Sequence, residues 1–171
     1  LGLLGFGMTT ILLNLHNAGL IPLSIVIIAM GIALGGLAQI IAGIFEFKNG
    51  NTFAGTAFVA YGTFWWSLVA IWMLAPVGLE ADAISMGYYL SVWGIFTGFM
   101  YIGTLTHNKI TQIVFASLTL LFALLAIGDF TGITWIKTLA GYEGILCGAS
   151  AFYSAVGQIV NQEHNKTIFP L

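Results

Sequence analysis

The chain is organised as long apolar runs separated by short polar breaks. A membrane-spanning helix needs about 20 mostly apolar residues, because each residue advances the helix by about 1.5 Å. Runs near or above that length cover residues 1–17, 21–47, 53–75, 84–104, 110–128 and 139–160. A membrane β-barrel would instead show alternating segments of about ten residues. The pattern therefore predicts an all-α membrane protein with six transmembrane helices in one domain, residues 1–171. Because the first run has no polar lead-in, we expect the natural chain to start further upstream.

The lysines are distributed unequally between the two ends of these helices. Six spans place both termini on one side, and Lys48, Lys109 and Lys166 fall on that side, whereas Lys137 falls on the other. An excess of Lys marks the cytoplasmic side of a membrane, and aromatic residues gather at membrane interfaces. Aromatic residues gather near the opposite end, at Trp72, Tyr88, Tyr89, Trp135 and Tyr142. We therefore predict that both termini are cytoplasmic.

Composition narrows the possible functions. Hydrophobic residues make up 59% of the chain and charged residues 6%, against roughly a quarter charged in a soluble domain. A net charge of −2 without any Arg does not suit the run of phosphate contacts that nucleic-acid binding requires, so we expect no nucleic-acid partner. The chain has one cysteine and no catalytic or phosphate-binding motif. We expect no enzymatic activity, no metal and no cofactor.

Neutral polar side chains recur at helical spacing inside the apolar runs. Such groups are costly in a bilayer and tend to face the bundle interior or a wet path. The candidate path-lining residues are Thr10, Asn14, Asn17, Gln39, Ser150, Ala151 and Ser154. They predict a solute path through the bundle, although hydroxyls and amides that join one helix to another would give the same pattern.

Three bulky residues lie at similar depth on three of the predicted helices. They are Phe6, Tyr61 and Leu118. Such residues can form a hydrophobic constriction that gates by dewetting. No Lys lies at mid-membrane depth, so any carboxylate that passes would do so without a buried counter-ion.

Two titratable residues are candidates for a proton-linked role. His16 lies at the outer end of the first span, where it either relays protons or is a hydrogen-bonded interfacial histidine. Glu46 lies at the inner end of the second span beside Lys48, where it is either proton-linked or a helix-end charge.

Small residues form two faces that allow close approach of helix backbones. Gly31 and Gly35 form a G-x-x-x-G pattern, and Gly141, Gly144 and Gly148 run along the last span. These faces serve either packing within the bundle or subunit contact. Since six helices are few to seal a path, we favour an oligomer.

Several stretches resemble one known family of membrane proteins. They are residues 1–17, 38–53, 120–128 and 147–151, which begin with the Leu-Gly-Leu that closes the signature N-P-A-P-L-G-L. The chain is identified on these stretches as similar to the acetate uptake transporter family, whose bacterial members are called succinate-acetate permeases.

The resemblance implies a hexamer in the cytoplasmic (inner) cell membrane, with a path for acetate and, less well, succinate in each subunit. It implies that Phe6, Tyr61 and Leu118 form the narrowest point and that Ala151 tunes substrate size. It also implies that Asn14 and Asn17 belong to the lining. It leaves open whether the mechanism is that of an anion channel or a proton symporter.

Two other function classes fit the residues without the resemblance. An uncharged lining also suits a pore for small neutral solutes such as urea, ammonia or water. The small-residue faces also suit a non-transporting structural subunit of a membrane complex.

Overall fold

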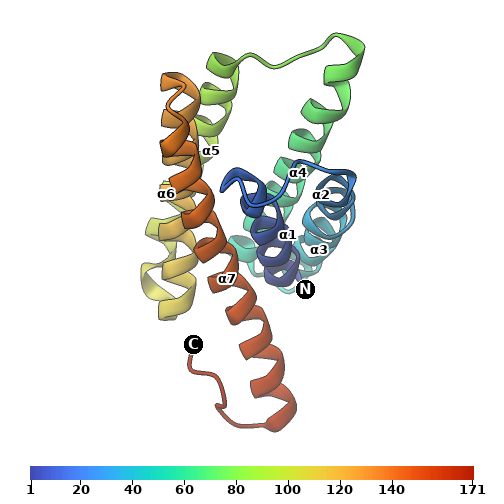
Figure 1. Ribbon diagram of the computed structural model, residues 1–171. Helices are drawn as coiled ribbons and strands as arrows, with labels where there is room; N and C mark the ends of the chain where they lie inside the picture. The colour runs from blue at the N-terminus through green and yellow to red at the C-terminus, as the bar shows by residue number, and fades with distance from the viewer.

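The computed structural model describes all 171 residues, and every regular element in it is a helix (Figure 1). The elements are α1 (Gly2–Asn17), α2 (Ile25–Met30), the π-helical η1 (Gly31–Ala38), α3 (Gln39–Lys48), α4 (Thr52–Leu74), the short 3₁₀ turn η2 (Ala75–Val77), α5 (Ala83–Gly103), the 3₁₀ turn η3 (Thr104–Thr106), α6 (Lys109–Thr131) and α7 (Thr134–His164). The all-α prediction is confirmed.

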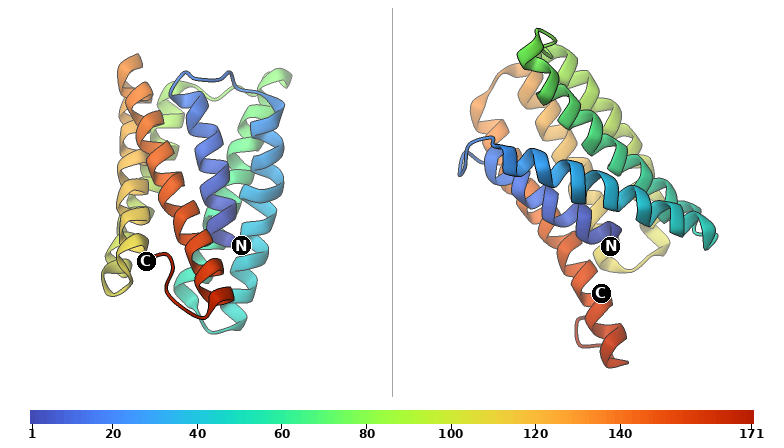
Figure 2. Two further views of the ribbon diagram at one scale, coloured as in Figure 1. Left: turned by 60° about the horizontal axis from the view of Figure 1, so that its bottom comes forward. Right: turned by 90° about the vertical axis from the view of Figure 1, so that its right-hand side faces the viewer.

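Six helical rods result, because α2, η1 and α3 run into one another without a break. Three rods are long and apolar enough to cross a membrane: Ile25–Lys48, Thr52–Val77 and Lys109–Thr131. The rods run side by side, and both termini lie at the same end of the bundle (Figure 2, left). The final turns of α7 extend beyond the other helices at that end (Figure 1).

Asparagine and aspartate side chains define the starts of three rods. Asn51 Oδ1 accepts a hydrogen bond from Ala54 N, Asp82 Oδ1 from Ser85 N, and Asn108 Oδ1 from Thr111 N. Each satisfies a backbone N–H that the first turn of a helix leaves free. The hydrogen bond from the Ser85 hydroxyl also holds the pKa of Asp82 below its ordinary value.

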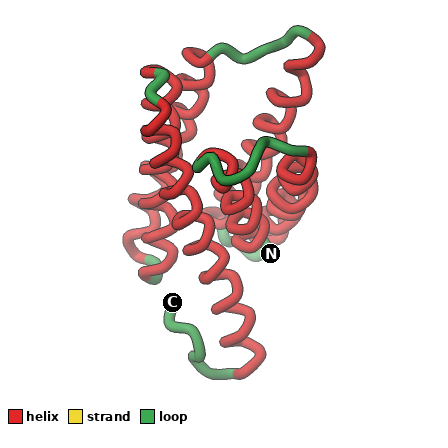
Figure 3. The backbone as a smooth tube through the Cα atoms, in the orientation of Figure 1, coloured by secondary structure: helices red, strands yellow, loops and turns green.

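Four predicted boundaries were wrong by three to five residues, and two of them are the ends of the last two helices, at Thr131 and His164 rather than residues 128 and 160. The second span begins at Ile25 rather than residue 21, because the connection before it carries Pro22 and runs extended to Ser24 (Figure 3). The last helix begins at Thr134 rather than residue 139. Gly132, with φ of 68°, allows a tight turn there, and Lys137 pairs with Asp129 across it.

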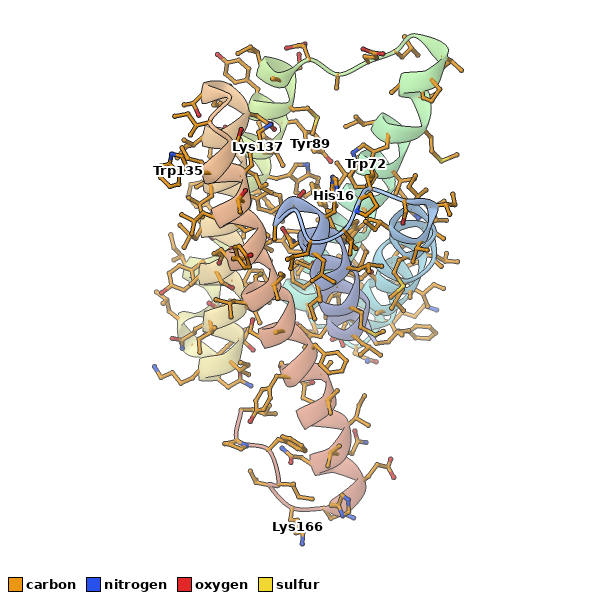
Figure 4. The ribbon with its side chains drawn as sticks, viewed as in Figure 1. His16, Trp72, Tyr89, Trp135, Lys137 and Lys166 are labelled. Carbon is orange, nitrogen blue, oxygen red and sulfur yellow. The ribbon has the colours of Figure 1, made fainter.

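The ends of the bundle carry the polar and aromatic groups that their sequence positions predict. His16, Trp72, Tyr89, Trp135 and Lys137 lie toward one end, and Lys166 lies at the far tip of the other (Figure 4). Lys166 lies at the end that carries the termini, as the charge pattern indicates.

Small residues bring helix backbones together within the chain. A Cβ added at Gly148 would lie 2.8 Å from the carbonyl oxygen of Gly7, so α7 and α1 touch through their backbones. Gly31 and Gly35 face Val69 and Trp65 of α4. Both small-residue faces therefore contain close contacts inside one subunit.

The packing of α4 against α5 is different, because side chains and not backbones bridge the two helices. Phe64 stacks on Tyr89 with ring centroids 5.7 Å apart and meets Trp93 edge-on at 5.1 Å. The Tyr89 and Ser67 hydroxyls lie 2.7 Å apart. Trp93 of this aromatic layer also lies beside Tyr61, with ring centroids 6.2 Å apart.

We expect Gly148→Ala to destabilise the bundle, because its new methyl group would meet the backbone of α1 at Gly7 and Ile11. Overpacking of this kind costs about 1–3 kcal/mol. Thermal unfolding of the purified protein in detergent would show a lowered midpoint. Gly98→Ala is the matched control, because its Cβ would meet nothing closer than Thr119 Cγ2 at 3.8 Å. An equal effect of both changes would contradict the close α1–α7 contact.

Candidate functional site: two cavities and their partition

A wide cavity of about 610 Å³ lies in the half of the bundle that carries the termini. Most of its lining is apolar, and its polar residues come from several rods: Gln39, Glu46, Asn51, His107, Thr111, Gln158 and Gln162. No lysine is among them.

A narrow cavity of about 30 Å³ lies beyond it, toward the opposite end. Its polar lining residues are Thr10, Asn14 and Asn17 of α1, and Trp65 of α4 also lines it. Its remaining lining is apolar and includes Leu13, Phe64, Leu121, Phe122 and Leu125. No charged side chain lines this cavity.

Three residues line both cavities, and they are Phe6, Tyr61 and Leu118. They come from α1, α4 and α6, and each is at most 6% exposed. The rings of Phe6 and Tyr61 lie 5.9 Å apart at their centroids. The three side chains thus form the partition between the wide and the narrow cavity.

Thr97 of α5 holds Tyr61 in this partition. The Tyr61 hydroxyl lies 3.0 Å from Thr97 Oγ1, and Thr97 Oγ1 donates to the carbonyl of Trp93 at 2.7 Å. A threonine hydroxyl has one hydrogen to donate, so Tyr61 is the donor to Thr97. Phe96 and Phe115 pack on other sides of the ring, with centroids 5.8 and 6.2 Å away. Both the ring and its proton are therefore fixed.

Sequence reasoning missed Thr97, which is not among the candidate path-lining residues. The sequence held no signal for it, because any helical threonine can bond the carbonyl four residues earlier, as Thr119 also does.

Asn14 organises the polar side of the narrow cavity. Its Nδ2 donates to the Thr10 carbonyl at 2.9 Å, and its Oδ1 accepts from Asn17 Nδ2 at 2.9 Å. A Cβ at Gly144 of α7 would overlap the Asn14 side chain, so the glycine leaves the room that Asn14 occupies. The structure brings together Thr10, Asn14 and Asn17 as the sequence pattern predicts.

Gln39 is wholly buried at the wide cavity. Its Nε2 donates to the Gly35 carbonyl at 2.7 Å, inside the π-helical segment. Such segments recur at functional sites. The predicted lining residue therefore lies at a cavity and is fixed by its own helix.

The three candidate lining residues of α7 lie behind the cavities. Ser150, Ala151 and Ser154 line neither of the two. Ser150 donates to the Cys147 carbonyl, and Ser154 accepts from Gln158, which does line the wide cavity. Ala151 is fully buried in the same apolar cluster as Phe6 and Leu118.

The two candidate proton-linked residues differ in their surroundings. His16 Nδ1 bonds the Ile21 carbonyl at 3.1 Å and so joins α1 to the connection that follows it. Glu46 lines the wide cavity, and its Oε2 accepts from Asn51 Nδ2 at 2.8 Å. The hydrogen-bonded interpretation of His16 agrees with this geometry.

The sequence and the fold of this chain are similar to those of known proteins. A family model described as the GPR1/FUN34/yaaH family matches residues 1–171. The succinate-acetate/proton symporter SatP of Escherichia coli strain K12 is 53% identical over 100% of this chain and 92% of its own length. Acetate permease A of Emericella nidulans is 31% identical over 100% of this chain and 64% of its own length. A solved structure of the bacterial acetate channel SatP matches with a TM-score of 0.98 and 53% identity, covering 100% of this chain and 96% of that one.

We expect Thr97→Val to release Tyr61, because valine keeps the shape of threonine and removes the only acceptor of the Tyr61 hydroxyl. Fluorine NMR of fluorotyrosine-labelled protein, with the Tyr61 resonance assigned through Tyr61→Phe, should show that signal shift and sharpen. Thr119→Val is the control, because the Thr119 hydroxyl bonds the carbonyl of Phe115 in its own helix. An unchanged Tyr61 signal in Thr97→Val would show that packing alone holds the ring.

Proposed function

The chain belongs to the GPR1/FUN34/yaaH family, and on that premise we propose that it transports acetate, and less well succinate and other small carboxylates, through a path within each subunit. The observation that carries the proposal is the meeting of two cavities at Phe6, Tyr61 and Leu118. The names of the similar proteins supply the substrate class, since they describe a succinate-acetate/proton symporter, an acetate permease and an acetate channel.

In this proposal the partition is a hydrophobic constriction. A carboxylate that passes between Phe6, Tyr61 and Leu118 loses its water of hydration. This loss is costly, because the charge is then buried without a partner. Conduction needs binding weak enough for release, and a narrow apolar gap gates by losing its water. Thr10, Asn14 and Asn17 offer neutral hydrogen bonds on one side, and Gln39 and Gln158 offer them on the other. Ser150, Ala151 and Ser154 support the lining from behind.

The membrane arrangement that we propose has six spans in a single domain, residues 1–171, with both termini cytoplasmic. In this arrangement the protein forms a homo-oligomer, a hexamer as the family resemblance implies, in the cytoplasmic membrane. The exposed surface supports a membrane-embedded oligomer, because one face of α5 presents large apolar side chains: Tyr88, Val92, Ile95, Phe99 and Ile102. Such a face requires lipid or neighbouring subunits to cover it.

The proposed function is tested by uptake of labelled acetate into vesicles that contain the purified protein. Uptake above that of empty vesicles, and competition by unlabelled acetate but not by urea, is expected. Competition by urea would favour a pore for neutral solutes. Uptake equal to empty vesicles, from a well-folded oligomer, would favour a structural subunit.

Replacement of Leu118 with Ala should widen the constriction and raise uptake of lactate or succinate relative to acetate by several-fold. Ala151→Gly should act in the same direction but more weakly, because Ala151 lies behind the lining. Initial uptake rates of the three acids give the ratio. Leu120→Ala is the control, because Leu120 is half-exposed on the same helix. A ratio that stays constant in Leu118→Ala would place the constriction elsewhere.

For coupling to protons, Glu46 is better placed than His16, because it lines the wide cavity. We expect Glu46→Gln to abolish acetate accumulation driven by a pH gradient while sparing acetate exchange across the vesicle membrane. The same loss in His16→Gln would transfer the role to His16. Retained accumulation in both variants, after subtraction of leakage into empty vesicles, would remove both candidates.

A further inference from the structure

The second rod changes its hydrogen-bond pattern halfway along. Its middle segment, η1, is π-helical over eight residues, whereas α2 before it and α3 after it are α-helical. A π-helix bonds residues five apart instead of four, and it is rare outside single turns. A π-helical turn therefore takes up one residue more than an α-helical turn.

The extra residue in η1 rotates α3 about its axis. Successive residues of an α-helix are turned by about 100°, since 3.6 of them complete a turn. The π-helical segment turns α3 back by one such step, relative to a continuous α-helix of the same sequence. In that continuous helix, Gln39 would take the direction that Ile40 has now, and Glu46 would take that of Phe47.

The rotation of α3 decides which of its residues reach the wide cavity. Gln39 and Glu46 line that cavity, whereas Ile40 and Phe47 do not. Ile40 and Phe47 instead pack against glycines of α4. Without the π-helical turn, both polar residues would face α4, and the wide cavity would lose Glu46, the one acidic side chain in its lining.

Two side chains bond to the backbone of η1. Trp66 Nε1 donates to the Ile32 carbonyl at 3.0 Å, and Gln39 Nε2 donates to the Gly35 carbonyl at 2.7 Å. Gly36 leaves room for the first bond, because a Cβ added there would overlap the Trp66 indole. The interior of a bilayer offers no water to replace such bonds, so they favour the backbone conformation in which both are made.

Trp66 holds η1 from outside the path. Its side chain is 43% exposed, and it lines neither cavity. The preceding residue, Trp65, is buried, and its Nε1 makes no hydrogen bond. The bond from Trp66 therefore reaches the cavity lining only through the helix that it holds.

We propose that η1 sets the rotation of α3, so that Gln39 and Glu46 face the wide cavity, and that Trp66 is the positioning residue that keeps η1 π-helical. The inference deepens the proposed function, on which it rests for the role of the wide cavity as part of the path. Neither the sequence pattern nor the cavities identify Trp66.

The rotation is tested by deletion of Leu37, a half-exposed residue of η1. One residue fewer lets the segment close as a plain α-helix, and α3 then keeps its present rotation. The reporters are Ala42→Cys, at a position that lines the wide cavity, and Ile40→Cys, at one that does not. Both are made with Cys147→Ala, which removes the native thiol.

A charged thiol reagent that does not enter lipid is applied to the protein in lipid nanodiscs. We expect Ala42→Cys to react in the full chain and in the deletion variant alike, and Ile40→Cys to react in neither. If the deletion instead turned α3 by one step, Ile40 would take the direction of Gln39. Reaction of Ile40→Cys in the deletion variant would therefore overturn the proposal.

The role of Trp66 is tested by Trp66→Phe, which keeps an aromatic ring and removes the indole N–H. In the full chain, we expect the labelling rate of Ala42→Cys to fall by about fivefold, the effect of one lost hydrogen bond. In the Leu37 deletion, which needs no π-helical turn, Trp66→Phe should leave the rate unchanged. Trp135→Phe, on the exposed surface of α7, is the control in both backgrounds.

The same fall in both backgrounds would mean that Trp66 only stabilises the bundle, and it would overturn the positioning role. An unchanged rate for Trp66→Phe in the full chain would overturn it as well, whether or not the deletion variant folds.

The labelling experiments use no acetate, so the two proposals fail in different ways. Acetate uptake by the unchanged protein without the expected labelling would refute the role of η1 alone. The expected labelling without acetate uptake would refute the proposed function alone.

Discussion

The structure depends on one constraint, which is that polar groups buried among apolar helices must find their partners inside the protein. Tyr61 meets it through Thr97, Asn14 through Thr10 and Asn17, and Gln39 through the Gly35 carbonyl. Each of these bonds fixes a side chain at or beside the partition. The chain meets the constraint incompletely, because Thr9 Oγ1, Thr10 Oγ1, Gln39 Oε1, Trp65 Nε1 and Glu143 Oε2 are buried without a hydrogen-bond partner.

Close backbone contacts set the frame in which these bonds form. Gly7 against Gly148 joins α1 to α7, and Gly5 against the Leu34 carbonyl joins α1 to the π-helical segment. Close approach on these two sides contrasts with the aromatic layer between α4 and α5, where rings hold the helices further apart. Phe6 therefore lies on a helix held rigidly from two sides, whereas Tyr61 faces a neighbouring helix through side chains. Phe6 and Tyr61, two of the three residues of the partition, are thus supported by different kinds of packing.

Neither cavity is lined by Arg or Lys, and this has a chemical consequence. Strong capture of a carboxylate would use Arg or Lys, and the chain has no Arg and places no Lys at either cavity. Neutral donors hold an anion more weakly, which suits a protein that passes its ligand on. The side-chain amides of Asn14 and Asn17 at the narrow cavity are donors of this kind.

The sequence by itself determined the all-helical class and the bounds of α1, α4 and α5 to within one residue, because these follow from local apolar periodicity. It also predicted Phe6, Tyr61 and Leu118 as bulky residues at one depth, and the tertiary structure places all three between the same two cavities. Only the tertiary structure decided that Thr97 bonds Tyr61 and that Ser150, Ala151 and Ser154 lie behind the lining. Only it distinguished Trp65 from Trp66, two identical residues next to each other in the chain. The reason is physical: helical spacing fixes which residues share a face, but the rotation and separation of helices that are distant in sequence determine what that face meets.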